Sequence, residues 1–236
     1  ADNNDNDDGG DDLTESTTEG SSSSSSPSQS KRQHIQQKLH HHLSSEKMYV
    51  QGYDKDGRAT FIFRPRCVKG HDKEWTLKEA VYTMERAIAC SARRHRERAA
   101  ASTNDDNDNN DDFPTINAVV DCAGFSAWKH SPPMEIGKEF MLALRNHYAG
   151  QVHKIFILDA PSSFAMLWNL VQPFLGSNTK AKITFVNGKK QRSKLVGQHY
   201  ATEQASPWML PGGKQPSTVD VSQYLRRTAF DRVFGE

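Results

Sequence analysis

Four side chains stand where α/β enzymes often place acids and bases. Asp121 and Asp159 each follow a short apolar run typical of a buried strand, and His153 and His199 are candidate bases. The sequence contains no GxSxG, GxxxxGK or GxGxxG motif, and no activated nucleophile accompanies the four residues. Surface or capping roles explain them more simply. We therefore expect no catalytic activity; a hydrolase-like enzyme would need a Ser–His or Cys–His pair assembled by the fold.

The histidines and cysteines do not predict a metal site. Consecutive His40, His41 and His42 project in different directions from a helix, so they cannot converge on one ion, and a polar tract explains them better. The DKDG run at 54–57 lacks the glutamate that closes a calcium-binding loop, which favours a turn. The cysteines (Cys67, Cys90 and Cys122) are far apart, which favours free thiols in a reducing compartment. We expect neither metal nor cofactor.

Composition divides the chain into a polar tail and one domain. Residues 1–30 have Leu13 as their only large apolar side chain, which predicts disorder, and a disordered acidic loop is expected at about residues 99–112. The formal net charge of +1 gives no electrostatic case for nucleic acid. Basic residues gather from Lys180 onward and would suit a local anionic partner such as a lipid headgroup. No apolar run reaches the roughly 20 residues that span a bilayer, and we expect a cytoplasmic protein.

Strand and helix patterns alternate after the tail, which predicts an α/β domain with a mixed, largely parallel sheet flanked by helices. A short amphipathic helix is expected at 31–46, followed by a hairpin around the DKDG turn. Buried strands are expected at 116–121, 154–160 and 182–186. Further helices are expected from Trp75 through the basic run 92–98, from Pro132 to Tyr148, and at 162–175 (with Ser162 as its cap), 189–200 and 221–230.

The helix expected at 162–175 is apolar on nearly all sides. Such a helix is either buried all round or faces an apolar ligand. The first alternative is a central core helix, and the second is a helix with one side on the core and the other lining a cavity. The pattern alone does not separate the two.

Four segments resemble, in order, motifs of the CRAL-TRIO family of lipid-binding domains, which includes fungal phosphatidylinositol/phosphatidylcholine transfer proteins, tocopherol transfer protein and retinaldehyde-binding protein. They are VVDCAGFS (119–126), KIFILDAPSSF (154–164), VQPFLGSNTKAKITFVNG (171–188) and LPGGK (210–214). The run GYDKDGRATFIFRP (52–65) resembles the family's first hairpin. The resemblance implies a lipid-binding domain over 48–236, with residues 31–46 as a possible remnant of an N-terminal helical bundle.

The resemblance also implies a lipid pocket closed by a gate helix within about 162–178. Thr179 and Lys182 match the residues that contact inositol phosphate in the family, and Lys180 adjoins them. Two departures bear on the headgroup. Tyr148-Ala149-Gly150-Gln151 lacks a headgroup-supporting glutamate, which weakens the case for phosphatidylinositol, and Ile116 and Ala118 replace the hydroxyl residues of phosphatidylcholine binders, which stands against phosphatidylcholine. The expected pocket residues are Phe125, Phe140, Leu144, Phe164, Leu167, Trp168, Val171 and Phe185.

These implications favour a non-catalytic protein that binds a phosphoinositide or other lipid and transfers or presents it, with transient contact at a membrane surface. The alternative is a regulatory scaffold that acts through protein partners such as small GTPases. The two differ in one structural respect, since a scaffold should fill its cavity with its own side chains.

Overall fold

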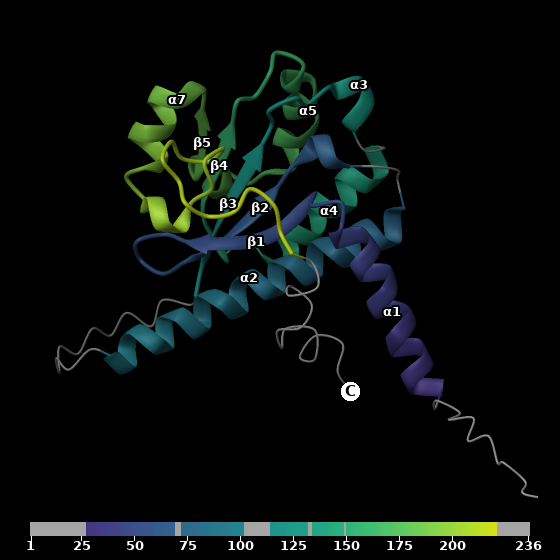
Figure 1. Cartoon of the computed structure of the whole chain (residues 1–236). Coiled ribbons are helices and arrows are strands. Elements are labelled where there is room, and N and C mark those ends of the chain that lie inside the picture. The colour runs from purple at the N-terminus through teal and green to yellow at the C-terminus, as the bar shows by residue number, and fades with distance from the viewer. Residues whose placement is uncertain (1–26, 69–71, 102–113, 132–133, 149, 221–236) are drawn as a thin grey trace, which may run out of the picture.

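The computed structural model describes residues 27–68, 72–101, 114–131, 134–148 and 150–220 (Figure 1). A five-stranded sheet in the order β1-β2-β3-β4-β5 forms its centre. The strands are β1 Met48–Tyr53, β2 Ala59–Phe63, β3 Ile116–Asp121, β4 Val152–Leu158 and β5 Ile183–Val186. The β1–β2 pair is antiparallel and the three other pairs are parallel, which confirms the mixed, largely parallel sheet.

The expected hairpin forms at the DKDG turn. The Asp54 carboxylate accepts hydrogen bonds from the backbone N–H groups of Asp56 (3.0 Å) and Arg58 (2.8 Å). Gly57 has a φ of +91°, a conformation that favours glycine. The carboxylate of Asp54 is therefore used to hold the turn that fixes the register of β1 against β2.

Helices connect the strands and differ in places from the sequence expectations. They are α1 Pro27–Leu43, α2 Lys73–Ala101, α3 Ala127–His130, α4 Met134–His147, α5 Phe164–Val171, α6 Ser177–Ala181 and α7 Gly188–Gln191. Short turns, mostly 3₁₀, lie at η1 Pro65–Cys67, η2 Gln172–Phe174, η3 Arg192–Val196 and η4 Thr202–Gln204. None of the helices in the described ranges is both long and apolar enough to cross a membrane.

Four of the expected helix boundaries were wrong. The helix expected at 162–175 ends as an α-helix at Val171, because Pro173 has no N–H to continue the ladder and the chain tightens into η2. Ser163, not Ser162, precedes this helix, and its side chain makes no capping bond. Helix α1 already begins at Pro27, and α2 includes residues 99–101, which the sequence assigned to the acidic loop. The expectations for 1–26, 102–113 and 221–236 lie outside the described residues.

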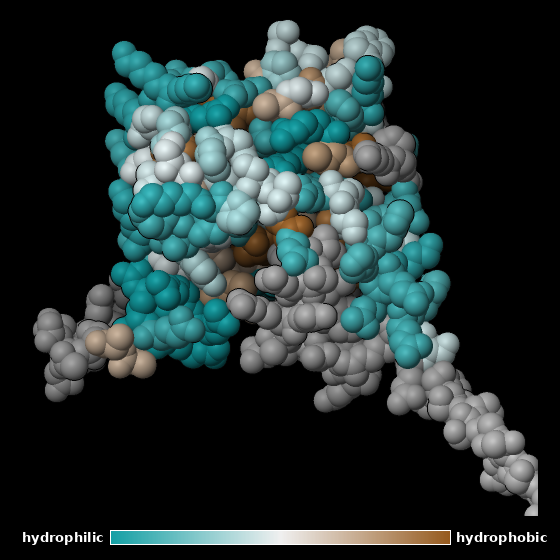
Figure 2. Space-filling model, viewed as in Figure 1, coloured by the Kyte–Doolittle hydropathy of each residue, from teal (hydrophilic) through white to brown (hydrophobic). Residues whose placement is uncertain are grey.

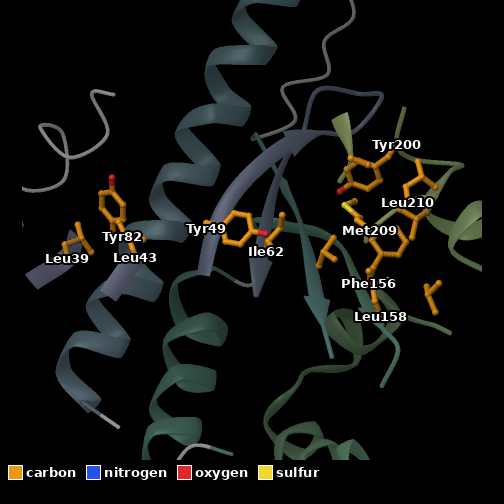
Figure 3. Packing of buried hydrophobic residues seen from close by; sticks show 14 residues of the cluster. Leu39, Leu43, Tyr49, Ile62, Tyr82, Phe156, Leu158, Tyr200, Met209 and Leu210 are labelled. Carbon is orange, nitrogen blue, oxygen red and sulfur yellow. The ribbon is translucent and has the colours of Figure 1, made fainter. Parts of the chain in front are cut away.

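The two faces of the sheet are covered differently. Helices α2, α4 and α5 cover one face, where side chains of β2 and β3 such as Phe61 and Ile116 pack against them. The C-terminal segment 192–219 covers the other face, and it crosses in front of the sheet in Figure 1. Figure 3 shows the core on this face, in which Tyr200, Met209 and Leu210 pack near Phe156 and Leu158 of β4.

Helix α1 is joined to the domain by apolar contacts and one buried ion pair. Leu39 and Leu43 are buried beside Tyr82 of α2 (Figure 3). After the turn that follows α1, and directly before β1, the Lys47 ammonium lies 2.8 Å from the carboxylate of Glu79, which is fully buried. His42 lies against this pair, with Nδ1 3.2 Å from Lys47 Nζ. It is therefore not part of an exposed polar tract, unlike His40 and His41.

Candidate functional site

An apolar cluster lies between α3, α5 and the sheet. Its fully buried members include Cys122 and Phe125, which follow β3, and Phe164, the first residue of α5. The other members are Ala127 of α3, Val120 of β3, Ile155 and Ile157 of β4, Leu167 and Trp168 of α5, Ile183 of β5, and Ala160. We refer to this set as the α5 cluster. It forms because β3 and β4 direct alternate side chains toward α5, while α5 returns its first and second turns to the sheet.

Aromatic rings connect the interior of the α5 cluster with the edge of the sheet. Phe125 and Phe164 have ring centroids 6.0 Å apart, Phe164 and Phe185 6.3 Å, and Phe185 and Trp168 5.2 Å, all close to perpendicular. Such edge-to-face pairs add to the stabilisation from burial. Phe185 lies on the edge strand β5 and is 41% exposed. The aromatic chain thus begins in the core and ends at solvent.

The predicted pocket residues divide between two clusters. Phe125, Phe164, Leu167 and Trp168 belong to the α5 cluster, and Phe185 joins it through its ring contacts. Phe140 and Leu144 of α4 pack elsewhere, against a cluster of α2 and the first three strands that contains Phe61 and Ile116. Val171 is half-buried at the end of α5. Since α4 contacts α5, the two clusters are adjacent.

The predicted headgroup residues lie around α6, before β5. Lys182 Nζ donates a hydrogen bond to the carbonyl of Val152 at 2.5 Å, which ties the half-buried ammonium to the start of β4. Thr179 is half-buried and Lys180 is exposed on the same short helix. An ammonium has three donors, so Lys182 retains donors for an anionic oxygen.

The comparisons with known proteins agree with this architecture. A family model described as the CRAL/TRIO domain matches residues 43–205, well over half of the chain. The chain belongs to this family. The crystal structure of Sfh5 has the same fold, with a TM-score of 0.55 at 13% sequence identity, covering 84% of this chain and 73% of that one.

Relatives from Arabidopsis thaliana are named phosphatidylinositol/phosphatidylcholine transfer proteins. SFH4 is 25% identical over 173 residues, which is 64% of this chain and 24% of that protein. SFH11 is 27% identical over 128 residues, 43% of this chain and 34% of that protein. SFH12 is 45% identical over 51 residues, 22% of this chain and 9% of that protein. The matched stretches therefore span about a third or less of each relative.

In this CRAL/TRIO domain, the carboxylate of Glu85 lies beside Tyr148, the first residue of the segment that lacks the family's glutamate. The sequence did not predict this contact. Tyr148 directly follows α4, and its hydroxyl donates a hydrogen bond to the carboxylate of Glu85 of α2 at 2.7 Å. Burial and then this carboxylate raise the pKa of the Tyr148 hydroxyl well above its usual range. Glu85 falls within the predicted α2 helix, but sequence spacing gives no sign of contact between residues 63 positions apart. A nearby buried oxygen, Gln151 Oε1, accepts no hydrogen bond from the described residues.

The CRAL/TRIO domain uses both strand-end aspartates in ion pairs. Asp121 lies 2.6 Å from Arg66 Nη1, and Arg64 Nε is 3.7 Å away. Asp159 pairs with Arg192 and accepts a hydrogen bond from the N–H of Gly188 at 2.9 Å. Asp159 also has a φ of +47°, a conformation that aspartate and asparagine tolerate better than most residues.

The candidate base in β4 is remote from the acid that follows that strand. His153 lies at the beginning of β4, whereas Asp159 follows its last residue. Six residues of extended chain separate the two by about 20 Å. Burial, and next the charge of Arg58, lower the pKa of the His153 imidazole. This pair therefore forms no catalytic dyad.

Proposed function

We propose that this CRAL/TRIO domain holds one lipid, with its acyl chains inside the α5 cluster, and moves it between membranes without chemical change. The observation that carries the proposal is the aromatic chain from buried Phe125 and Phe164 to the 41%-exposed Phe185. A large apolar ring left exposed beside a half-buried tryptophan at a sheet edge provides an apolar entrance. A displacement of α5 would open this entrance to the interior.

Burial of acyl chains would supply the affinity. Each methylene removed from water contributes about 0.8 kcal/mol, so one chain of ordinary length offsets both the ordering cost and the loss of ring contacts within the α5 cluster. The aromatic rings meet edge to face, through apolar contact. Separating them costs mainly apolar contact, which the acyl chain replaces.

The headgroup in this proposal is an anionic phosphate held by Lys182, Thr179 and Lys180. The names of the Arabidopsis relatives include phosphatidylinositol and phosphatidylcholine together, and an ammonium with a neighbouring hydroxyl suits the phosphate of phosphatidylinositol. Phosphatidylcholine is disfavoured. Ile116 is fully buried in a different cluster and has no group that could bind a choline headgroup.

Native mass spectrometry of the purified chain, followed by lipid extraction, tests the proposal. We expect one lipid per chain, and reduced occupancy in Phe185→Glu, because a carboxylate at the entrance is costly to desolvate. Val81→Glu is the matched control, since Val81 is 39% exposed but lies on α2. Equal occupancy in the two variants would contradict the location of the site.

A second comparison tests the headgroup residues. Lys182→Ala should weaken retention of anionic phospholipid by about tenfold or more, the usual effect of one charged hydrogen bond. Lys189→Ala removes an exposed lysine of α7 and should change nothing. If Lys182→Ala retains anionic lipid as well as the unmodified chain does, the headgroup is not held there.

The regulatory alternative has one observation in its favour. The rings of Phe125, Phe164 and Phe185 fill part of the α5 cluster themselves, as expected of a domain that acts through protein partners. A stable chain that is purified empty and takes up no lipid from liposomes would favour this function, including partners such as small GTPases.

A further inference from the structure

Helix α3 presents a tryptophan almost completely to solvent. Trp128 is 89% exposed, the highest value among the large apolar side chains in the described ranges. Its neighbour Ala127 is buried in the α5 cluster. Two adjacent residues of this single turn therefore face opposite environments: Ala127 lies in the core and Trp128 projects away from it.

The turn that carries Trp128 is well held. The backbone N–H groups of Lys129 and His130 donate to the carbonyl of Ser126 at 3.1 and 2.9 Å. The N–H of Ser126 in turn donates to His130 Nδ1 at 2.9 Å. The backbone of the turn is therefore fixed, while the indole of Trp128 is left almost uncovered by the described residues.

The exposed tryptophan lies at the same end of the molecule as the start of α5. Helices α3 and α5 contact each other and lie together at the top of Figure 1, where the parallel strands end. Met166 of α5 is 62% exposed, two residues after buried Phe164, so α5 also directs an apolar side chain outward. By contrast, Figure 2 shows a mostly polar surface over the C-terminal segment, with its apolar atoms in a central recess.

The charges around Trp128 suit an anionic surface. Lys129 follows it directly and is exposed. Asp121, which ends the strand before α3, is neutralised by Arg66 and Arg64 and adds no free negative charge. Tryptophan favours the headgroup region of bilayers because its ring is apolar and its N–H is polar, and lysine nearby favours anionic lipids.

We propose that Trp128, with Lys129 beside it and Met166 of α5, inserts into the headgroup region of an anionic bilayer and directs the α5 cluster toward the membrane. This inference rests on the proposed function, since a lipid can enter only where the site faces a bilayer. Phe125 precedes α3 and contacts Phe164 of α5, so the inserted turn is directly joined to the residues that the acyl chains would meet.

Vesicle binding tests the inference. Sedimentation with vesicles of phosphatidylcholine and phosphatidylserine at about 4:1 should show at least tenfold weaker binding for Trp128→Ala, the loss expected for one large apolar side chain. Val81→Ala, at a residue 39% exposed on α2, should bind as the unmodified chain does. Lys129→Ala should weaken binding to these vesicles but not to vesicles of phosphatidylcholine alone.

Fluorescence gives a second, independent measurement. Bromine-labelled lipids should quench part of the tryptophan emission of the unmodified chain, and Trp128→Ala should abolish that part. Equal vesicle binding by Trp128→Ala, or no quenching in the unmodified chain, would overturn the inference. Trp128-dependent self-association in sedimentation would also overturn it, in favour of a second copy of the chain.

The outcomes separate the inference from the function on which it rests. If Trp128→Ala binds vesicles normally and the chain still carries lipid in native mass spectrometry, only the docking residue is wrong. If the unmodified chain carries no lipid but binds vesicles through Trp128, the docking surface stands and the lipid-carrier function fails.

Discussion

At the scale of single residues, Arg64 joins parts of the chain that are far apart in sequence. Its guanidinium lies between the rings of Tyr49 and Trp208, 5.2 and 4.6 Å from their centroids. It also lies 3.2 Å from Glu46 and donates to the carbonyl of Ser217 at 3.0 Å. Because Arg64 is 5% exposed, these contacts are screened little by water.

Replacement of Arg64 should destabilise the fold strongly. Arg64→Met leaves Glu46 without its cation and releases the C-terminal segment at Ser217, so the free energy of unfolding should fall by about 3 kcal/mol. Arg66 still neutralises Asp121, which keeps the loss near the lower end for a buried ion pair. Urea unfolding followed by circular dichroism measures the change.

An exposed arginine provides the control for Arg64. Arg93 pairs with Glu97 on the surface of α2 with its side chain 60% exposed. Arg93→Met should cost no more than about 0.5 kcal/mol. Equal losses in the two variants would show that Arg64 acts as an ordinary surface charge.

At the scale of elements, α1 docks on α2 through few groups. Leu39 is fully buried, and His42 of α1 contacts the Lys47–Glu79 pair. The exposed side of α1 carries polar and basic residues, so its stability depends on this contact more than on its own helix propensity.

Loss of the Leu39 side chain should release α1 from the domain. Leu39→Ala creates a cavity that costs about 3 kcal/mol, and most of the effect should appear as local opening of α1. Hydrogen exchange should show faster exchange of the α1 amides with little change in β3 and β4. His40→Ala, at an exposed neighbour, should leave the exchange unaltered; a uniform increase over the whole domain would contradict the local docking.

The elements also show what the sequence could predict. Strands β3, β4 and β5 could be predicted because they are short apolar runs that a buried parallel sheet requires, and the hairpin because its turn chemistry is local. The break at Pro173 was missed because the apolar pattern continues through Phe174 and Leu175. Contacts made only in the folded chain, such as Tyr148 with Glu85 and His42 with the Lys47–Glu79 pair, have no sequence signal.

The candidate site was predicted in the same uneven way. Phe125, Phe164, Leu167, Trp168 and Phe185 come together because each lies on or beside an element that borders the same sheet face. Phe140 and Leu144 do not join them, since helix periodicity gives the apolar side of α4 but not which neighbour that side meets. The exposure of Trp128 could not be predicted either, because a tryptophan is usually largely buried.

At the scale of the whole molecule, two histidines connect global stability with pH. Burial, and then the charge of Arg58, lower the pKa of His153; burial, and then Lys154, lower that of His199. The unfolded chain binds protons at these residues near pH 6.5, before the folded protein does. The stabilisation is therefore complete above about pH 6.5 and is lost as the pH falls below that value toward the lowered pKa values.

As the pH is lowered from 7.5 to 5.5, the urea concentration at which half of the protein is unfolded should therefore decrease. This pH window lies above the usual range in which carboxylates titrate. A His153→Gln/His199→Gln double variant should show a flatter profile over the same window, because it removes the two groups that bind protons preferentially in the unfolded chain. His41→Gln is the control, since His41 is exposed on α1, and its profile should match that of the unmodified chain. A double variant that loses stability as steeply would place the responsible protons on other groups.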